Sequence, residues 1–76
     1  MTEGLNGRRT MRELIVRRLR AARVSKGISQ ATVAKAIGMT QASVVNYELH
    51  GRPLPIDAAL LWADVVGLER EKLIDV

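Results

Sequence analysis

The sequence of 76 residues contains no cysteine, no phenylalanine and a single histidine. The absence of cysteine excludes a disulfide framework, a thiolate nucleophile and the usual structural zinc sites. No apolar run approaches the roughly 18 residues of a membrane-spanning helix. A glycine-rich phosphate loop and paired carboxylates in an apolar setting are also missing. We therefore expect a soluble intracellular protein that is not an enzyme and holds no metal or cofactor.

The chain is long enough for one small domain and too short for two. Residues 1–9 include Arg8 and Arg9 and carry almost no apolar side chains, so we expect a flexible basic arm there. Residues 10–76 then form the folded domain. A core of this size leaves no room for a large substrate cavity.

Charge is distributed unevenly along the chain. The net charge is +4, but residues 1–52 carry ten Lys and Arg against three acids, whereas residues 53–76 carry two against five. Nine of the twelve basic residues are arginine, whose planar guanidinium pairs well with phosphate and guanine. This pattern favours a polyanion as partner of the N-terminal part, although a solvated charged surface without a partner would look the same.

Capping residues and the helical spacing of apolar residues predict an all-α fold, a compact bundle of about five short helices. Thr10 and Glu13 form a capping-box pattern at the start of the first helix, which should run to about Lys26. The further helices are expected from Gln30 to Ile37 after a Ser29 cap, from Gln41 to about His50 after a Thr40 cap, from Pro55 as a first-turn residue to Gly67, and from about Glu69 to Ile74.

The second and third of these helices are separated by three residues that begin with Gly38. Two short helices joined in this way are typical of a helix-turn-helix unit, whose second helix enters the major groove of DNA. Val44 and Tyr47 should face inward from that helix. A longer series of residues is in register with a known pattern: Leu19, Arg23, Gly27, Ile28-Ser29-Gln30, Val33-Ala34, Ile37-Gly38-Met39-Thr40, Val44, Tyr47-Glu48, Ala63 and Gly67. With these residues the chain resembles the DNA-binding domains of phage repressors and Cro proteins and their bacterial relatives, in a lambda-repressor-like arrangement.

This resemblance implies base contacts from the outer face of the third helix. Gln41, Ala42 and Asn46 match the base-reading positions, and Val45 lies beside them. An amide side chain pairs with adenine, and a methyl group packs against thymine, which favours A·T pairs in the site. Without the resemblance, an ordinary solvated helix face would explain the same residues.

Phosphate contacts are implied at the ends of the two helices. The expected phosphate-contacting residues are Ser29, Gln30, Ser43, Arg23 and Arg52, with Arg8 and Arg9 of the arm in a minor groove or along the backbone. A disordered tail that improves solubility is an equal explanation for the arm.

Arg23 and Glu48 match a pair that joins the first helix to the end of the recognition helix in several members of the family. We expect a structural ion pair between them. The sequence departs from the family pattern just beyond it, because His50 stands where glycine is common and Gly51 follows one residue later. The recognition helix is therefore expected to run longer, and His50 has three open roles: phosphate contact, helix cap or solvent exposure.

A regulator that reads few base pairs per helix usually binds as a dimer on an inverted repeat. The acidic C-terminal segment offers Leu68, Leu73, Ile74 and Trp62 for a dimer surface, with a core position as the alternative for Trp62. The sequence thus predicts a DNA-binding transcriptional regulator, a repressor or Cro-like protein, in the cytoplasm of a bacterium or a phage-infected cell. The alternative is an antitoxin or another interaction module that acts by binding a protein partner, such as a toxin or an anti-repressor.

Overall fold

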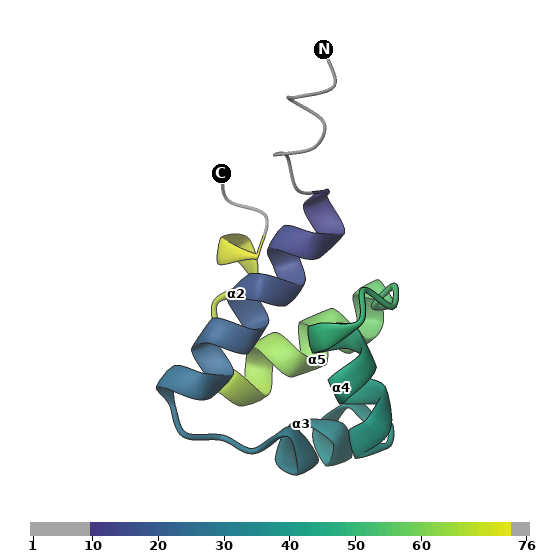
Figure 1. Cartoon of the computed structure of the whole chain (residues 1–76). Helices are drawn as coiled ribbons and strands as arrows, with labels where there is room; N and C mark the ends of the chain where they lie inside the picture. The colour runs from purple at the N-terminus through teal and green to yellow at the C-terminus, as the bar shows by residue number, and fades with distance from the viewer. Residues whose placement is uncertain (1–9, 74–76) are drawn as a thin grey trace.

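The computed structural model describes residues 10–73 of the chain (Figure 1). Within this range the chain forms α2 (Met11–Ser25), α3 (Gln30–Ile37), α4 (Gln41–Leu49), α5 (Ile56–Val66) and a 3₁₀ turn, η1 (Arg70–Lys72). Residues 10–73 contain no strand, so the all-α prediction is confirmed. The predicted number of about five helices is slightly off, because residues 10–73 contain four α-helices and one 3₁₀ turn.

The N-terminal caps of the first three helices are those that the sequence predicts. At the start of α2, the Glu13 N–H donates to Thr10 Oγ1 at 3.1 Å and the Thr10 N–H donates to Glu13 Oε1 at 2.9 Å, which is a complete capping box. The Thr32 N–H donates to Ser29 Oγ at 3.0 Å, and the Ser43 N–H donates to Thr40 Oγ1 at 3.1 Å. Pro55 differs from the prediction, since it occupies the cap position of α5 and precedes its first turn.

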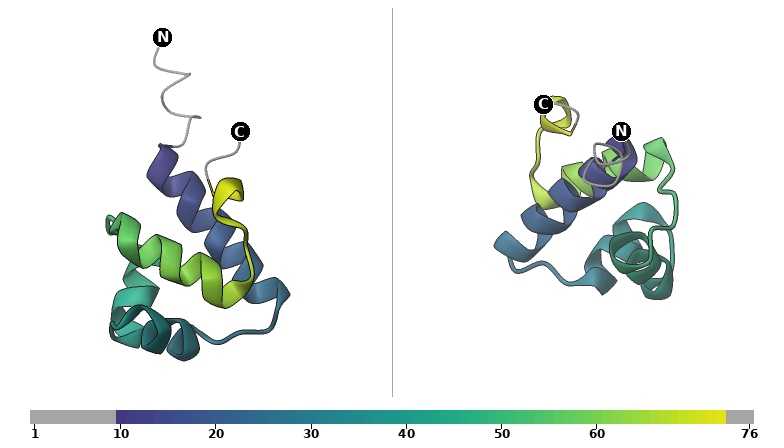
Figure 2. Two further views of the ribbon diagram at one scale, coloured as in Figure 1. Left: turned by 180° about the vertical axis from the view of Figure 1, so that it is seen from behind. Right: turned by 45° about the horizontal axis from the view of Figure 1, so that its top comes forward.

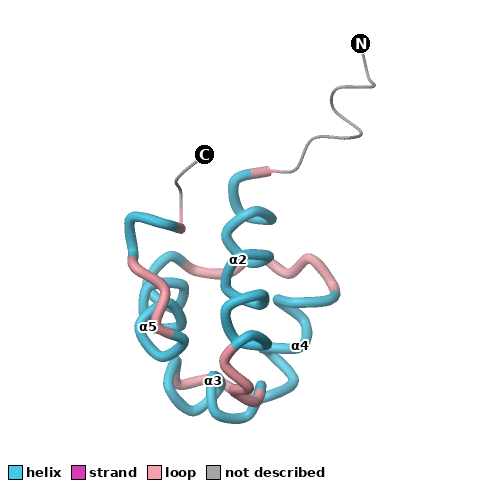
Figure 3. Tube along the Cα trace, turned by 90° about the vertical axis from the view of Figure 1, so that its left-hand side faces the viewer, coloured by secondary structure: helices cyan, strands magenta, loops and turns pink. Residues whose placement is uncertain are grey.

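The core receives side chains from all four α-helices. Trp62, Leu19, Val33, Val44 and Val66 are its largest fully buried side chains. α5 packs against both α2 and α3 (Figure 2), and α2 lies between α5 and α4 when the bundle is seen from the side (Figure 3). This packing holds α3 and α4 on one side of the bundle. No helix in residues 10–73 has the length and apolar character needed to cross a membrane.

The last predicted helix is a single 3₁₀ turn in its described part. The Lys72 N–H donates to the Glu69 carbonyl at 2.9 Å, and the Leu73 N–H donates to the Arg70 carbonyl at 3.1 Å. Arg18 Nη1 of α2 donates to the carbonyls of Lys72 and Leu73 at 3.0 and 3.1 Å. Arg18 thus provides a donor for two backbone carbonyls that lie at the end of the described chain, and it ties the 3₁₀ turn to α2.

Candidate nucleic-acid interface

The turn between α3 and α4 fixes the angle between the two helices. Gly38 ends α3 with φ +71°, a left-handed conformation that glycine adopts without steric cost. The Met39 N–H donates to the Ala34 carbonyl at 2.9 Å, and the Tyr47 hydroxyl donates to Met39 Sδ at 3.2 Å. Ala34 and Tyr47 are both buried between the helices. The predicted helix-turn-helix unit is therefore a packed unit in which α4 is held at a fixed orientation relative to α3.

The outer face of α4 carries amide, hydroxyl and methyl groups and no charge. Gln41 and Ala42 are exposed, while Val45 and Asn46 are partly exposed. Val44 and Tyr47 point into the core, as the sequence predicts. This face of α4 can therefore donate and accept hydrogen bonds, and it presents no negative charge that would repel a polyanion.

The start of α4 and the start of α3 present polar groups to solvent. Thr40 Oγ1 donates to Ser43 Oγ at 3.1 Å, which leaves the Ser43 O–H as a donor. At the start of α3, Ser29 is exposed and its Oγ lies 2.9 Å from Thr32 Oγ1. Free backbone N–H groups in the first turn of each helix add to the anion-binding capacity of these side chains.

Glu48, whose side chain is 0% exposed, is the centre of a part-buried polar network. Arg23 Nε and Nη2 donate to Glu48 Oε2 and Oε1 at 2.7 and 3.0 Å, so the structure brings together the pair that the resemblance implies. Gln30 Nε2 donates to Glu48 Oε1 at 3.1 Å, and Arg20 Nε lies 3.5 Å from the same oxygen. Arg23 Nη1 also donates to the Ile28 carbonyl at 2.8 Å. This network joins α2, the start of α3 and the end of α4.

Sequence reasoning missed Arg20 and Gln30 as partners of Glu48. Arg20 stands three residues before Arg23, a spacing that places both on one side of α2 and could have indicated it. Gln30 gave no such signal, because its contact with Glu48 depends on how the start of α3 packs beside the end of α4. The network limits the phosphate contacts that were expected of Arg23 and Gln30. The Arg23 side chain is only 12% exposed, and Gln30 uses one of its two amide N–H groups on Glu48.

The end of α4 explains the unusual position of Gly51. Helix α4 ends at Leu49, one residue earlier than predicted, and exposed His50 occupies the cap. Gly51 follows with φ +69°, and the Arg52 N–H then donates to the Asn46 carbonyl at 3.2 Å. This bond spans six residues, whereas the corresponding bonds after α2, α3 and α5 span five.

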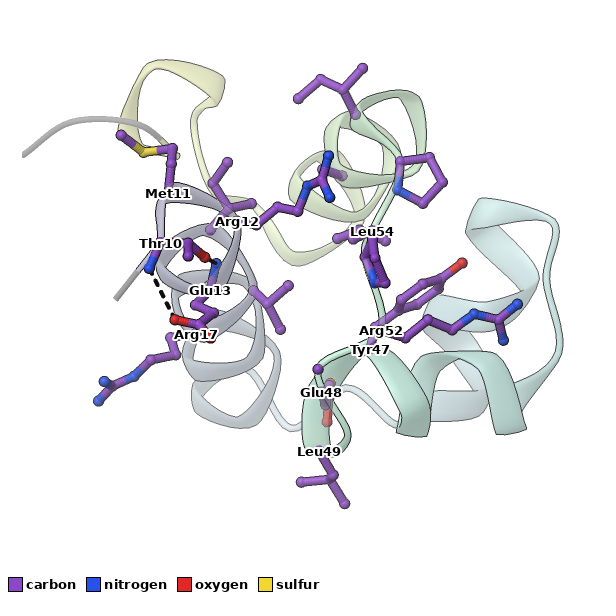
Figure 4. A pocket seen from close by; sticks show the side chains of 17 residues that line it. Thr10, Met11, Arg12, Glu13, Arg17, Tyr47, Glu48, Leu49, Arg52 and Leu54 are labelled. Carbon is purple, nitrogen blue, oxygen red and sulfur yellow. Dashed lines mark hydrogen bonds between the residues drawn. The ribbon is translucent and has the colours of Figure 1, made fainter. Parts of the chain in front are cut away.

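The same turn places the Arg52 side chain alongside an aromatic ring. Arg52 Cζ lies 5.7 Å from the centroid of the Tyr47 ring, within the range of a cation–π interaction. Figure 4 shows the Arg52 guanidinium extending beside Tyr47. An exposed arginine is thus held in a preferred direction near the end of α4.

The residues expected at a dimer surface fall into different environments. Trp62 and Leu73 are 0% and 2% exposed, so neither offers surface to a second copy. This corrects the expectation for Leu73 and agrees with the core alternative for Trp62. Leu68 is half-buried against the core. Ile74, like Arg8 and Arg9, lies outside the described residues.

At the C-terminal end, Arg70 and Asp64 form an exposed ion pair. Arg70 Nη2 lies 2.9 Å from Asp64 Oδ2. The hydrogen bond to Asp64 and the attraction of its charge raise the pKa of the Arg70 guanidinium above its usual value. The pair neutralises part of the acidic C-terminal segment and lies away from α4.

Comparison with known proteins agrees with this geometry. A sequence model described as helix-turn-helix matches residues 19–73. A protein of Methanosarcina mazei carries the name "Putative HTH-type transcriptional regulatory protein". It is 33% identical over 58 residues, which are 76% of this chain and 18% of that protein. A protein of Methanosarcina acetivorans with the same name is 31% identical over the same shares. The chain thus spans less than a fifth of the length of these relatives, and no solved structure matches it. The chain belongs to the helix-turn-helix family.

Proposed function

We propose that the protein is a transcriptional regulator of the repressor or Cro-like type that binds specific sequences in double-stranded DNA. The observation that carries this proposal is the outer face of α4, which is uncharged, bears amide groups and is held outward by the burial of Val44 and Tyr47. The major groove of B-DNA admits an α-helix presented in this way. Family membership and the names of the two relatives support the proposal. The protein acts by binding, without catalysis, in the compartment that holds the DNA.

Base reading is assigned to Gln41, Ala42, Asn46 and Val45. An amide both donates and accepts, so Gln41 and Asn46 are suited to adenine N6 and N7. The methyl groups of Ala42 and Val45 are suited to the thymine methyl. Gln41 and Ala42, at the start of α4, are the more exposed and should contribute most to discrimination.

Phosphate binding is assigned to the polar groups around α4. Ser43 lies at its start, Arg52 just beyond its end, and Ser29 and Gln30 at the start of α3. The second amide N–H of Gln30 is the group proposed for the phosphate, while the first one bonds Glu48. Arg23 contributes mainly positive potential, because its guanidinium is largely covered. Arg8 and Arg9 keep their proposed role in a minor groove or along the backbone.

The proposed regulator works as a homodimer on an inverted repeat, because one helix reads too few base pairs for a unique site. With Trp62 and Leu73 in the core, Leu68 and Ile74 remain as proposed apolar contributors to the dimer surface. The acidic charge of this segment keeps it away from DNA.

Selection of binding sites from random duplexes tests the function. We expect enrichment of a half-site with A·T pairs that is repeated in inverted orientation. Gln41→Ala should then lose about 1–3 kcal/mol of discrimination at one base pair, because the other contacts are unchanged. Glu71→Gln, a change in an exposed residue of η1, is the matched control and should leave specificity unaltered. Equal losses by Gln41→Ala on specific and random DNA would contradict base reading.

A further inference from the structure

A groove of about 910 Å³ runs between the start of α2, the end of α4, the following loop and the start of α5. Three of its lining side chains are large, apolar and unusually exposed: Met11 at 48%, Leu49 at 55% and Ile56 at 59%. They come from three different helices, so the apolar surface is a product of the fold rather than of one amphipathic helix. Figure 4 shows Met11 and Leu49 on the two sides of this groove.

The groove is separate from the surface proposed to read bases. None of the four base-reading side chains lines it, and of the proposed phosphate contacts it includes Arg52 at one edge. A DNA backbone would gain nothing from covering Met11, Leu49 and Ile56, because it has no apolar side chains to bury against them. The DNA-binding role therefore does not account for this surface.

The charges on the groove are mostly positive. Arg12, Arg17 and Arg52 are exposed lining residues, and the Arg12 side chain extends across the groove toward Leu54 (Figure 4). The two lining carboxylates are already engaged: Glu13 accepts the Thr10 N–H in the capping box, and Glu48 is covered by Arg23. The start of α5 borders the groove, and the exposed Asp57 in its first turn offsets the positive end of the helix dipole but is not a lining residue.

We propose that this groove docks an acidic amphipathic segment of another protein. The apolar side chains of that segment bury against Met11, Leu49 and Ile56, and its carboxylates face Arg12, Arg17 and Arg52. A second copy of the chain is a poorer occupant in a two-fold arrangement, since two copies of the same mostly positive groove would then face each other. The inference is independent of the proposed DNA-binding function. One consequence alone rests on that function: Arg52 lies at both surfaces, so the docked segment competes with phosphate for its side chain.

Selection of helical peptides displayed on phage, with the full chain as bait, tests the proposal. A Leu49→Ser/Ile56→Ser double variant serves as counter-selection, since both residues are exposed and their replacement leaves the core intact. We expect peptides that prefer the unaltered chain and share at least two carboxylates and two large apolar residues. Failure to enrich any peptide over the double variant, or a consensus without acids, would overturn the proposal.

Binding of the selected peptide to single variants locates the site. Ile56→Ser and Arg12→Glu should each weaken binding at least tenfold. Leu61→Ser, which removes a similarly exposed leucine of α5 outside the groove, should change binding less than twofold. Far-ultraviolet circular dichroism verifies the fold of each variant. Equal weakening by Leu61→Ser would overturn the assignment to the groove, as would sedimentation of the free chain as a dimer that Ile56→Ser dissociates.

Discussion

Two arginine–carboxylate pairs of similar geometry lie in different surroundings. Arg23 and Glu48 meet at 2.7 Å with side chains that are 12% and 0% exposed, whereas Arg70 and Asp64 meet at 2.9 Å with side chains that are 55% and 54% exposed. The first pair joins two helices and receives further donors. The second joins the end of α5 to the adjacent turn. The comparison shows that contact distance alone does not measure what a pair contributes, because burial and shared partners determine the cost of losing it.

The largest effect is expected when the buried acid is removed. Glu48→Ala should lower the free energy of unfolding by about 3 kcal/mol, because it leaves Arg23 covered and without its carboxylate. Denaturation by urea measures the change. Glu48→Gln is the matched control: it keeps the shape and one acceptor for Gln30, so its loss should be smaller. A melting temperature of Glu48→Ala equal to that of the unaltered protein would show that the pair has no structural role.

Replacing the planar guanidinium of Arg23 by an ammonium group keeps the positive charge, so it separates the contribution of hydrogen-bond geometry from that of charge attraction. Arg23→Lys should cost about 1–2 kcal/mol, because an ammonium cannot donate to both Glu48 oxygens and to the Ile28 carbonyl as the guanidinium does. The same urea titration reports it. Arg17→Lys, at an exposed position of the same helix, is the control and should be nearly neutral. Equal stability of Arg23→Lys and the unaltered chain would mean that charge alone holds the end of α4.

A smaller loss of stability is expected from a change in the turn that follows α4. Gly51→Ala should destabilise the fold by about 1 kcal/mol, because alanine resists φ +69° although no atom lies within 4 Å of the added methyl group. The change should also weaken binding to all DNA sequences to a similar degree, by disturbing the direction of Arg52. His50→Ala, at the exposed cap before it, is the control. A variant as stable as the unaltered chain would show that this turn is not restricted to glycine.

Most of the fold could be predicted from local sequence patterns. The errors arose where one residue type is compatible with two different environments. Thr10, Ser29 and Thr40 each accept from the amide three positions away, so sequence alone suffices to place those caps. Leu73 was misplaced in the dimer expectation, and Trp62 was left between core and interface, because an apolar residue in an acidic segment suits either position. Which one it is depends on how α5 and the last turn pack.

The hydrogen bond from Gln30 to Glu48 is a part of the candidate site that the sequence could not predict. The resemblance paired Glu48 with Arg23, but side-chain direction across 18 residues of sequence depends on the packed positions of α3 and α4. The outer face of α4 was accessible to prediction because Val44 and Tyr47 determine which side is buried. The apolar groove was not, since it forms only where the start of α2 packs beside Leu49 and Ile56, which are far from Met11 in sequence.

The smallest effect is expected at the exposed pair. Asp64→Asn should leave the urea midpoint unchanged at physiological salt, because solvent screens both side chains. The raised pKa of Arg70 adds no pH dependence near neutrality: its contribution is complete below the pKa of the unfolded state and is lost only when pH rises through the still higher folded value, both in the strongly alkaline range. A pH titration of stability from 5 to 9 that is identical for Asp64→Asn and the unaltered chain would complete the contrast with Glu48. A clear loss of stability in Asp64→Asn would instead show that η1 depends on this pair to stay packed against α5.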